Sequence, residues 1–260
     1  MSIVGMIAFP TSSVARKLLI AISGLLIIGF LFFHLAGNLY LFQGQAAFNG
    51  YVQKLESFGW LIYMGEAALG ALFLYHAVQG IRIAMLNSAA RKHSYAEKQR
   101  LGKGSLASLS MPISGTIILI FLIIHIWNFR LQKDSLHLES GHADLYTVVV
   151  NTFQNPAYVC LYIVAMLCVG LHLAHAFQSS LRTLGLTQPS WLNLGRQVGL
   201  GLAVFFTVSF SAFPVYFLAQ GTPTPGVKGY ETPIEIQNEA DLVRDVEHKL
   251  GQPGTPAPTH

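Results

Sequence analysis

Four long apolar stretches of this sequence contain histidine, an ionisable side chain that is uncommon there. One histidine from each stretch is considered first: His34, His76, His125 and His172. A titratable group in the hydrocarbon core of a membrane is costly, so it normally faces a partner or a cavity and marks a functional site. Imidazole binds metal ions and transfers protons near neutral pH. These histidines are therefore the first candidates for chemistry, with plain hydrogen bonding between helices as the alternative for any single one.

The elements that carry them have the composition of an integral membrane protein. Of 260 residues, 52% are hydrophobic and only 11% are charged, and the mean hydropathy is +0.48. A membrane-spanning helix needs about 20 mostly apolar residues. We expect an all-α integral membrane fold, a bundle of five transmembrane helices. The expected spans are residues 16–41, 60–85, 112–129, 156–181 and 195–219.

The chain divides into a transmembrane domain, residues 1–219, and a polar tail, residues 220–260, that is too rich in Pro and Gly to form a core. Residues 42–59 and 130–155 are expected only as connections. No internal repeat is evident, and the spans are not closely similar to one another.

Basic residues predict the orientation, because positive charge is retained on the cytoplasmic side. Residues 86–110 hold several basic side chains against one acid, so this connection is expected inside. The N-terminus is then cytoplasmic, and the tail lies outside. The side chains concerned are Arg91, Lys92, His93, Lys98, Arg100 and Lys103, against Glu97; Arg16, Lys17, Arg182 and Arg196, the last two in a turn, agree.

The depth of each histidine predicts which of them meet. His34 lies 18 residues past Arg16, or about 27 Å along a helix, and His125 lies near the end of the other outward span. They form an expected outer pair. His76 and His172 each lie 16 residues into an inward span, about 24 Å along, and form an expected inner pair.

Two imidazoles that face each other across a helical bundle suit the axial ligation of a haem. A zinc site would need three or four converging ligands, and a proton relay would need carboxylates in series. The pattern therefore favours bis-histidine haem, and a polar network or proton path stays open as the alternative. His175 rivals His172, because it lies three residues on along the same helix face. Glycines on the same spans are expected to let the macrocycle approach: Gly37, Gly70, Gly80 and Gly170.

Other chemistries lack their motifs. There is no nucleotide-binding glycine motif, no cysteine cluster for an iron–sulfur centre and no attachment motif for a c-type haem. The net charge of +4 requires no nucleic-acid partner.

Four pieces carry a resemblance to a known family: FLFFHLAGN, FLYHAVQGIRIA, FLIIHIWNFR and LYIVAMLCVGLHLAH. Together with the five-helix order, they resemble the single-chain, two-haem cytochrome b558 membrane anchor of succinate:quinone oxidoreductases, over about residues 12–219. The resemblance implies that His34 and His125 hold the outer, distal haem. It also implies that His76 and His172 hold the inner, proximal haem, which selects His172 over His175.

The same resemblance implies that the chain is one subunit of a larger enzyme. A flavoprotein subunit with covalent FAD would oxidise succinate in the tricarboxylic acid cycle, and an iron–sulfur subunit would pass the electrons on. This chain carries neither motif, so it would be the membrane subunit, conducting electrons through two haems b to a quinone, expected to be menaquinone. The expected location is the bacterial cytoplasmic membrane. The basic residues of segment 86–110 are expected either to dock the partner subunits or only to set the orientation of the chain in the membrane.

The quinone site is expected on the outer side, where the family has an acidic residue just before its second helix. Here that residue is Glu56, with Lys54, Ser57 and Trp60 beside it. Glu66, in the outer half of the second span, is expected either to handle protons beside the quinone or to bond at the interface.

One departure and two rival functions remain. In some fumarate-reducing relatives a glutamate assigned to proton transfer lies two residues before the fourth-helix ligand, and here that position is Gly170. The first rival is a di-haem anchor of a hydrogenase or formate dehydrogenase. The second is a transporter or channel that uses the buried histidines and Glu66 without redox chemistry.

Overall fold

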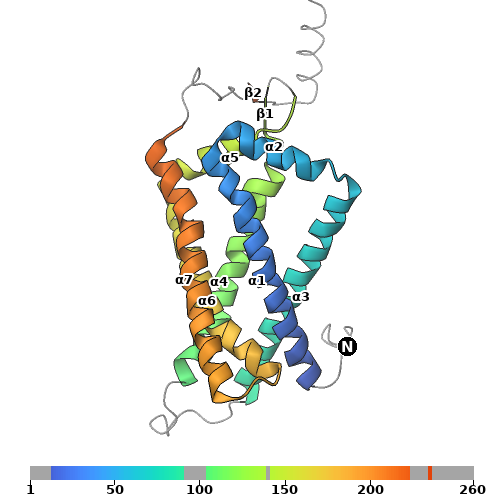
Figure 1. Ribbon diagram of the computed structural model, residues 1–260, viewed down its shortest axis with the longest axis vertical. Helices are drawn as coiled ribbons and strands as arrows, with labels where there is room; N and C mark the ends of the chain where they lie inside the picture. Colours follow the sequence, from blue (N-terminus) through green and yellow to red (C-terminus); the bar gives the residue numbers. More distant parts are fainter. Residues whose placement is uncertain (1–12, 91–103, 139–140, 223–233, 236–260) are drawn as a thin grey trace, which may run out of the picture.

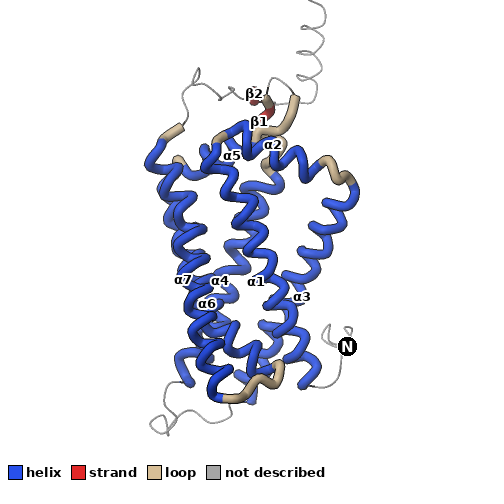
Figure 2. Tube along the Cα trace, viewed as in Figure 1, coloured by secondary structure: helices blue, strands red, loops and turns tan. Residues whose placement is uncertain are grey.

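The computed structural model describes residues 13–90, 104–138, 141–222 and 234–235, and these form a bundle of long helices (Figure 1). The five spans expected from hydropathy are found as five helices long and apolar enough to cross a membrane. They run alternately up and down the bundle (Figure 2). Their bounds are α1 Ser13–Asn38, α3 Trp60–Ala90, α4 Gly104–Ile126, α6 Pro156–Thr183 and α7 Pro189–Gln220.

Short helices cover one end of the bundle, which we call the cap end; the opposite end is the base end (Figure 1). The connections 42–59 and 130–155 contain helices that the sequence did not predict, α2 Gln45–Glu56 and α5 Leu145–Phe153. The 3-10 turn η2 Leu39–Gln43 and the π-helical turn η3 Trp127–Leu131 lie across the ends of the first and third expected spans. At 12 and nine residues, α2 and α5 are too short for their periodicity to stand out, and tertiary packing stabilises such helices.

A buried carboxyl group holds the two cap helices together. Asp144 is fully buried, and its oxygens accept hydrogen bonds from Gln45 Nε2 at 2.7 Å and Asn49 Nδ2 at 2.7 Å. It also caps α5 by accepting from the Thr147 backbone N–H at 3.1 Å. Because one end of α5 and one face of α2 share this acceptor, the cap is fixed as a unit.

The tail returns to the cap end. Strand β2 (Ile234–Glu235) pairs antiparallel with β1 (Leu136–His137) in the connection before α5. The rest of the tail past residue 222 lies outside the described residues. So does most of the basic connection, with Arg91, Lys92, His93, Glu97, Lys98, Arg100 and Lys103.

Helices α6 and α7 make the closest crossing. A Cβ atom at Gly199 would come within 3.2 Å of the Ala174 carbonyl oxygen, and Thr207 Oγ1 donates to the Met166 carbonyl at 3.0 Å. Pro189 starts α7 at its first turn, where proline is preorganised for a helix. As a result α7 begins six residues before the expected start, and Arg196 lies within the helix rather than in a turn.

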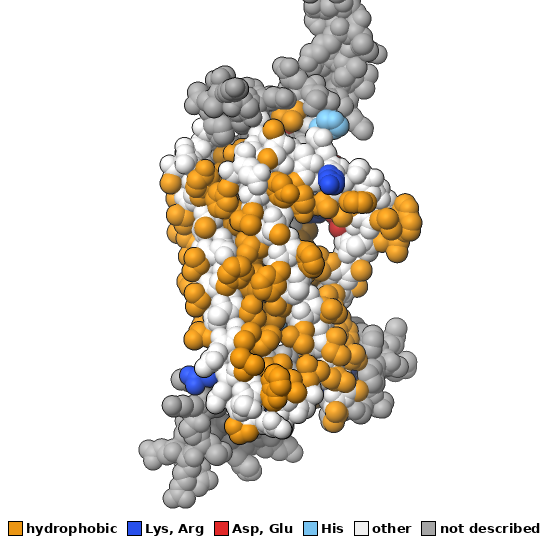
Figure 3. All heavy atoms as spheres, in the orientation of Figure 1, with side chains coloured by type: hydrophobic (Ala, Val, Ile, Leu, Met, Phe, Trp, Pro, Cys, Tyr) orange, Lys and Arg blue, Asp and Glu red, His pale blue; other side chains and the backbone are white. Residues whose placement is uncertain are grey.

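Helix α3 packs loosely by comparison. Among its described side chains Gln79 alone is buried, although the helix is mostly apolar. Figure 3 shows apolar side chains over most of the visible face and a hollow beside the cap-end half of the molecule. The core therefore lies among α1, α4, α6 and α7, and α3 stands against it with space to spare.

Removing the shared acceptor should loosen the cap. Asp144→Ala leaves three buried donors without their acceptor, and each costs about 1–3 kcal/mol. We expect a clearly lower melting temperature in detergent and faster amide hydrogen exchange in α2 and α5.

The matched control is Asp134→Ala, at a carboxyl side chain that is 64% exposed, which should change neither quantity. Equal melting temperatures for the Asp144→Ala variant and the unaltered chain would contradict this role.

Candidate functional site

The structure brings the four histidines together in the pairs that their depth predicts. The His34 and His125 ring centroids lie 5.7 Å apart, with the ring planes at 82°. The His76 and His172 centroids lie 6.3 Å apart, at 68°. We call these the cap-side pair and the base-side pair. The cap-side pair joins α1 to α4 and the base-side pair joins α3 to α6, so the two pairs lie at two levels along the bundle.

Aromatic side chains enclose the cap-side pair. Phe30 stacks on His34 at 5.3 Å between centroids, and Phe210 lies 5.8 Å from the same ring. Phe121 lies 5.6 Å from His125, and Tyr162 Oη lies 3.3 Å from His125 Nδ1. The cap-side imidazoles therefore sit in an apolar environment with one hydroxyl partner.

Serine hydroxyls contact the base-side pair. Ser23 Oγ on α1 lies 3.0 Å from His76 Nδ1 on α3. Ser114 Oγ on α4 lies 3.2 Å from His172 Nδ1 on α6. Neither serine is predicted from the sequence as a site residue, because a single hydroxyl in an apolar span is common and carries no signal alone.

A repeat that the sequence analysis also missed relates the two serines. Residues 22–34 align without gaps with residues 113–125, and seven of the 13 positions are identical. The identical pairs are Ile22/Ile113, Ser23/Ser114, Gly24/Gly115, Ile27/Ile118, Phe30/Phe121, Leu31/Leu122 and His34/His125. The expectation that the spans are not closely similar to one another therefore does not hold for this segment. The equal 11-residue spacing from serine to histidine was the available signal.

The repeat extends to contacts in space. A Cβ atom at Gly24 would lie 3.2 Å from His76 Cε1, and one at Gly115 would lie 3.4 Å from His172 Cε1. Helices α1 and α3 thus form a half of the site that α4 and α6 repeat. In each half, a glycine on one helix lies where the histidine ring of the neighbouring helix contacts it.

Two of the four glycines expected to face a macrocycle, Gly37 and Gly170, serve other contacts. A Cβ atom at Gly37 would lie 2.6 Å from Tyr51 Oη. One at Gly170 would overlap the Thr207 hydroxyl of α7, so the position that is glutamate in some relatives here faces a helix crossing. Gly70 has open space around it, and Gly80 has only Ile20 nearby.

The rival of His172 does not face the pair. His175 is exposed on α6, whereas the His172 ring faces His76. The geometry of the pair therefore favours His172 over His175 as the partner of His76.

The donor set fits a haem. Among the described residues, no three His, Cys, Asp or Glu side chains converge as an ordinary metal site does. An iron bound between two imidazole nitrogens holds the ring centroids about 6 Å apart, because each metal–nitrogen bond is about 2 Å long. Both pairs have nearly this separation. Helix α3, which carries His76, buries only Gln79 among its described side chains.

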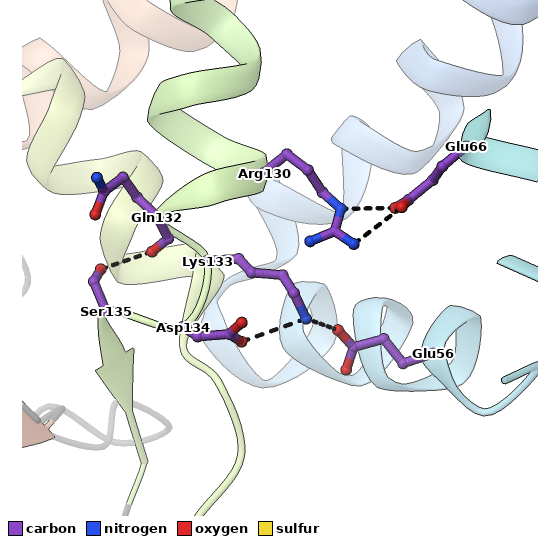
Figure 4. Close-up of polar contacts among 7 residues, drawn as sticks. All are labelled: Glu56, Glu66, Arg130, Gln132, Lys133, Asp134 and Ser135. Atoms are coloured by element: carbon purple, nitrogen blue, oxygen red, sulfur yellow. Dashed lines mark hydrogen bonds and ion pairs between the residues drawn. The ribbon is translucent and has the colours of Figure 1, made fainter. Parts of the chain in front are cut away.

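Ion pairs join the quinone candidates Glu66 and Glu56 to Arg130 of the π-helical turn η3 and to Lys133 in the loop after it (Figure 4). Arg130 binds Glu66 through Nε and Nη2, at 2.8 and 3.0 Å. Lys133 Nζ lies 2.6 Å from Glu56 Oε1 and 3.3 Å from Asp134 Oδ1. Burial lowers the pKa of Lys133, but the hydrogen bond and charge of Glu56, with Asp134, outweigh it and raise the pKa above its usual value. Lys133 therefore stays protonated and positively charged beside Glu56.

The other residues expected near the quinone lie around the α2–α3 turn. Ser57 Oγ donates to the Lys54 carbonyl at 2.7 Å, and the Lys54 side chain is exposed. Trp60 is 68% exposed at the start of α3. These three side chains neighbour Glu56 along the chain.

A cavity of about 390 Å³ lies elsewhere at the cap end. Trp127 and Asn128 of the π-helical turn line it, two and three residues past His125. Its wall also includes Gln132, Thr152 and Tyr158. The sequence analysis did not predict this cavity, because α5 and the π-helical turn that form it were not predicted.

The chain is similar to one curated protein by sequence. It is 26% identical to the succinate dehydrogenase cytochrome b558 subunit of Bacillus subtilis (strain 168) over 159 residues, which are 61% of this chain and 73% of that protein. No protein-family model matches the chain, and no solved structure gives a significant match. The fold is thus that of an all-helical bundle consistent with a multi-pass membrane protein, and the distant similarity supports a likeness to this cytochrome b subunit.

Proposed function

We propose that this chain is the membrane anchor of a succinate dehydrogenase and delivers electrons to a quinone, holding two haems b. The observation that carries the proposal is the presence of two facing histidine pairs at two levels of one helical bundle. Their ring centroids lie 5.7 and 6.3 Å apart. The sequence similarity to a succinate dehydrogenase cytochrome subunit agrees with it. The chain would serve the enzyme as its membrane subunit, with no succinate site of its own.

Each histidine pair has a defined role in this proposal. His34 and His125 would be the axial ligands at the cap side, and His76 and His172 those at the base side. Haem b at each pair would supply a one-electron redox centre. The protein orients the imidazoles, and the aromatic side chains around the cap-side pair, such as Phe30 and Phe121, exclude water from them.

The partners follow from what the chain lacks. A flavoprotein subunit with FAD and an iron–sulfur subunit would dock at the base end, which we place on the cytoplasmic side of a bacterial membrane. The basic segment with Arg91, Lys92, Arg100 and Lys103 is our candidate for that contact. The cap end and the C-terminal tail would then face outward.

The quinone, which we take to be menaquinone, would bind at the cap end near His125. Quinone reduction takes up two protons, so a titratable group should lie within hydrogen-bonding reach of a quinone oxygen. The acidic candidates are Glu56 and Glu66. Lys54, Ser57 and Trp60 neighbour Glu56 and would help to bind the quinone. The cavity at Trp127 and Asn128 is the rival location, since it begins within one helical turn of His125.

The alternatives make different demands. A di-haem anchor of a hydrogenase or formate dehydrogenase would bind the same haems but purify with a different catalytic partner. A transporter would bind none. The ion pair between Glu66 and Arg130 favours a redox protein over a transporter. A transporter of this kind would use the Glu66 carboxylate together with the histidines, whereas here the carboxylate is bound to Arg130.

Alanine substitutions test the ligand assignment. His34→Ala or His125→Ala should remove the cap-side haem and spare much of the base-side haem, and His76→Ala or His172→Ala should do the converse. Haem quantification and low-temperature spectra of each variant measure this.

The matched control is His175→Ala, at an exposed histidine one turn from His172, which should retain both haems. Loss of a haem in that control with both retained in the His172→Ala variant would reverse the assignment on α6.

A second substitution tests the quinone site. Glu56→Gln keeps the shape of the side chain and removes its charge. In the assembled complex we expect succinate oxidation with an artificial acceptor to persist, both haems to remain and quinone-linked turnover to fall by at least tenfold.

The control is Asp134→Asn, because Asp134 also contacts Lys133. This variant removes a negative partner of Lys133 but keeps the Glu56 carboxylate, so quinone-linked turnover should stay normal. Normal quinone-linked turnover in the Glu56→Gln variant would move the site, and the cavity at Trp127 and Asn128 would become the better location.

A further inference from the structure

The direction of two hydrogen-bond chains at the base-side pair can be derived from their acceptors. A serine hydroxyl has a single hydrogen to donate. Ser23 Oγ lies 2.9 Å from the Ile20 carbonyl oxygen, and Ser114 Oγ lies 2.7 Å from the Ser110 carbonyl oxygen. A carbonyl oxygen only accepts, so each hydroxyl hydrogen is taken by its own helix.

The imidazoles must then be the donors. His76 Nδ1 at 3.0 Å from Ser23 Oγ, and His172 Nδ1 at 3.2 Å from Ser114 Oγ, meet an oxygen whose hydrogen is already used. Each ring therefore carries its hydrogen on Nδ1 and keeps the Nε2 lone pair free. Both base-side histidines obtain the same tautomer by the same device.

The repeat makes this device independent of a single contact. Ser23 and Ser114 occupy equivalent positions of the segments 22–34 and 113–125, and each precedes a glycine that lets the histidine ring approach the helix. Both serines act on the base-side pair. On the cap side the corresponding contact to His125 comes from a phenol, Tyr162.

We propose that Ser23 and Ser114 are positioning residues that fix His76 and His172 as Nδ1–H donors, direct Nε2 toward the iron and lower the reduction potential of the base-side haem. The inference rests on the proposed function. A ligating histidine that donates its second N–H becomes a more basic ligand. A more basic ligand stabilises ferric iron, and hydrogen bonding around the ligands is one of the means by which a protein sets a haem potential.

The test is a redox titration of the assembled protein carrying Ser23→Ala, Ser114→Ala or both. Each single variant should raise the midpoint potential of the base-side haem and change its ferric electron paramagnetic resonance signal. The double variant should raise the potential further, while the cap-side potential stays unchanged. Ser23→Thr and Ser114→Thr keep the hydroxyl and should restore the original potential.

Thr116→Val is the matched control. Thr116 Oγ1 donates to the Pro112 carbonyl at 2.8 Å, two residues from Ser114, but its side chain is exposed. Its removal should leave both potentials unchanged. If an alanine variant loses the base-side haem, Ser23→Cys and Ser114→Cys decide the matter, because they keep the volume with a weaker acceptor and should raise the potential by a smaller amount.

Unchanged potentials and unchanged spectra in the alanine variants, or in the cysteine variants if those are needed, would overturn the inference and leave the serines as packing residues. Failure of the proposed function looks different, since the unaltered protein would then contain no haem to titrate.

Discussion

Polar groups in an apolar bundle must find partners inside the protein, and the rest of this structure depends on how four imidazoles do so. Water is absent from the hydrocarbon region, so an unpaired ring nitrogen there is costly. The base-side rings use serine hydroxyls that are themselves bonded to backbone carbonyls. The cap-side rings lie among phenyl groups, with one phenol as partner. Under the proposed function, a haem iron between the facing rings of each pair would satisfy a further ring nitrogen on each histidine.

This requirement also explains the uneven packing of the helices. Glycines at 195 and 199 let α7 lie directly on α6, and this crossing makes a rigid wall. Helix α3, in contrast, is held by His76, by Phe73 against Phe30 and by the Glu66–Arg130 ion pair. An apolar helix attached through a few specific contacts is compatible with the proposed binding of a flat cofactor between it and its neighbours. The contacts of Gly24 with His76 and of Gly115 with His172 repeat between the α1/α3 and α4/α6 halves.

The sequence was sufficient for the features that depend on length and periodicity. Span length and hydropathy predicted five helices, and the helical rise per residue placed His34 with His125 and His76 with His172. It was insufficient for α2 and α5, whose stability comes from the buried Asp144 and its partners 95 and 99 residues away along the chain. The serines and Gly24 and Gly115 were missed for a different reason. Their meaning appears only when spans are aligned with one another, and Gly37 and Gly170 look identical to them in sequence while facing Tyr51 and α7.

The central claim is that each histidine pair holds one haem b, and the most direct measurement is haem stoichiometry. The full chain, purified in detergent after expression with sufficient haem, would be analysed by its reduced-minus-oxidised spectrum and by pyridine haemochrome quantification. Two b-type haems per chain, both low-spin as two imidazole ligands require, are the predicted result. A chain that is folded and helical but binds no haem, or binds one haem that survives substitution of either pair, would contradict the account.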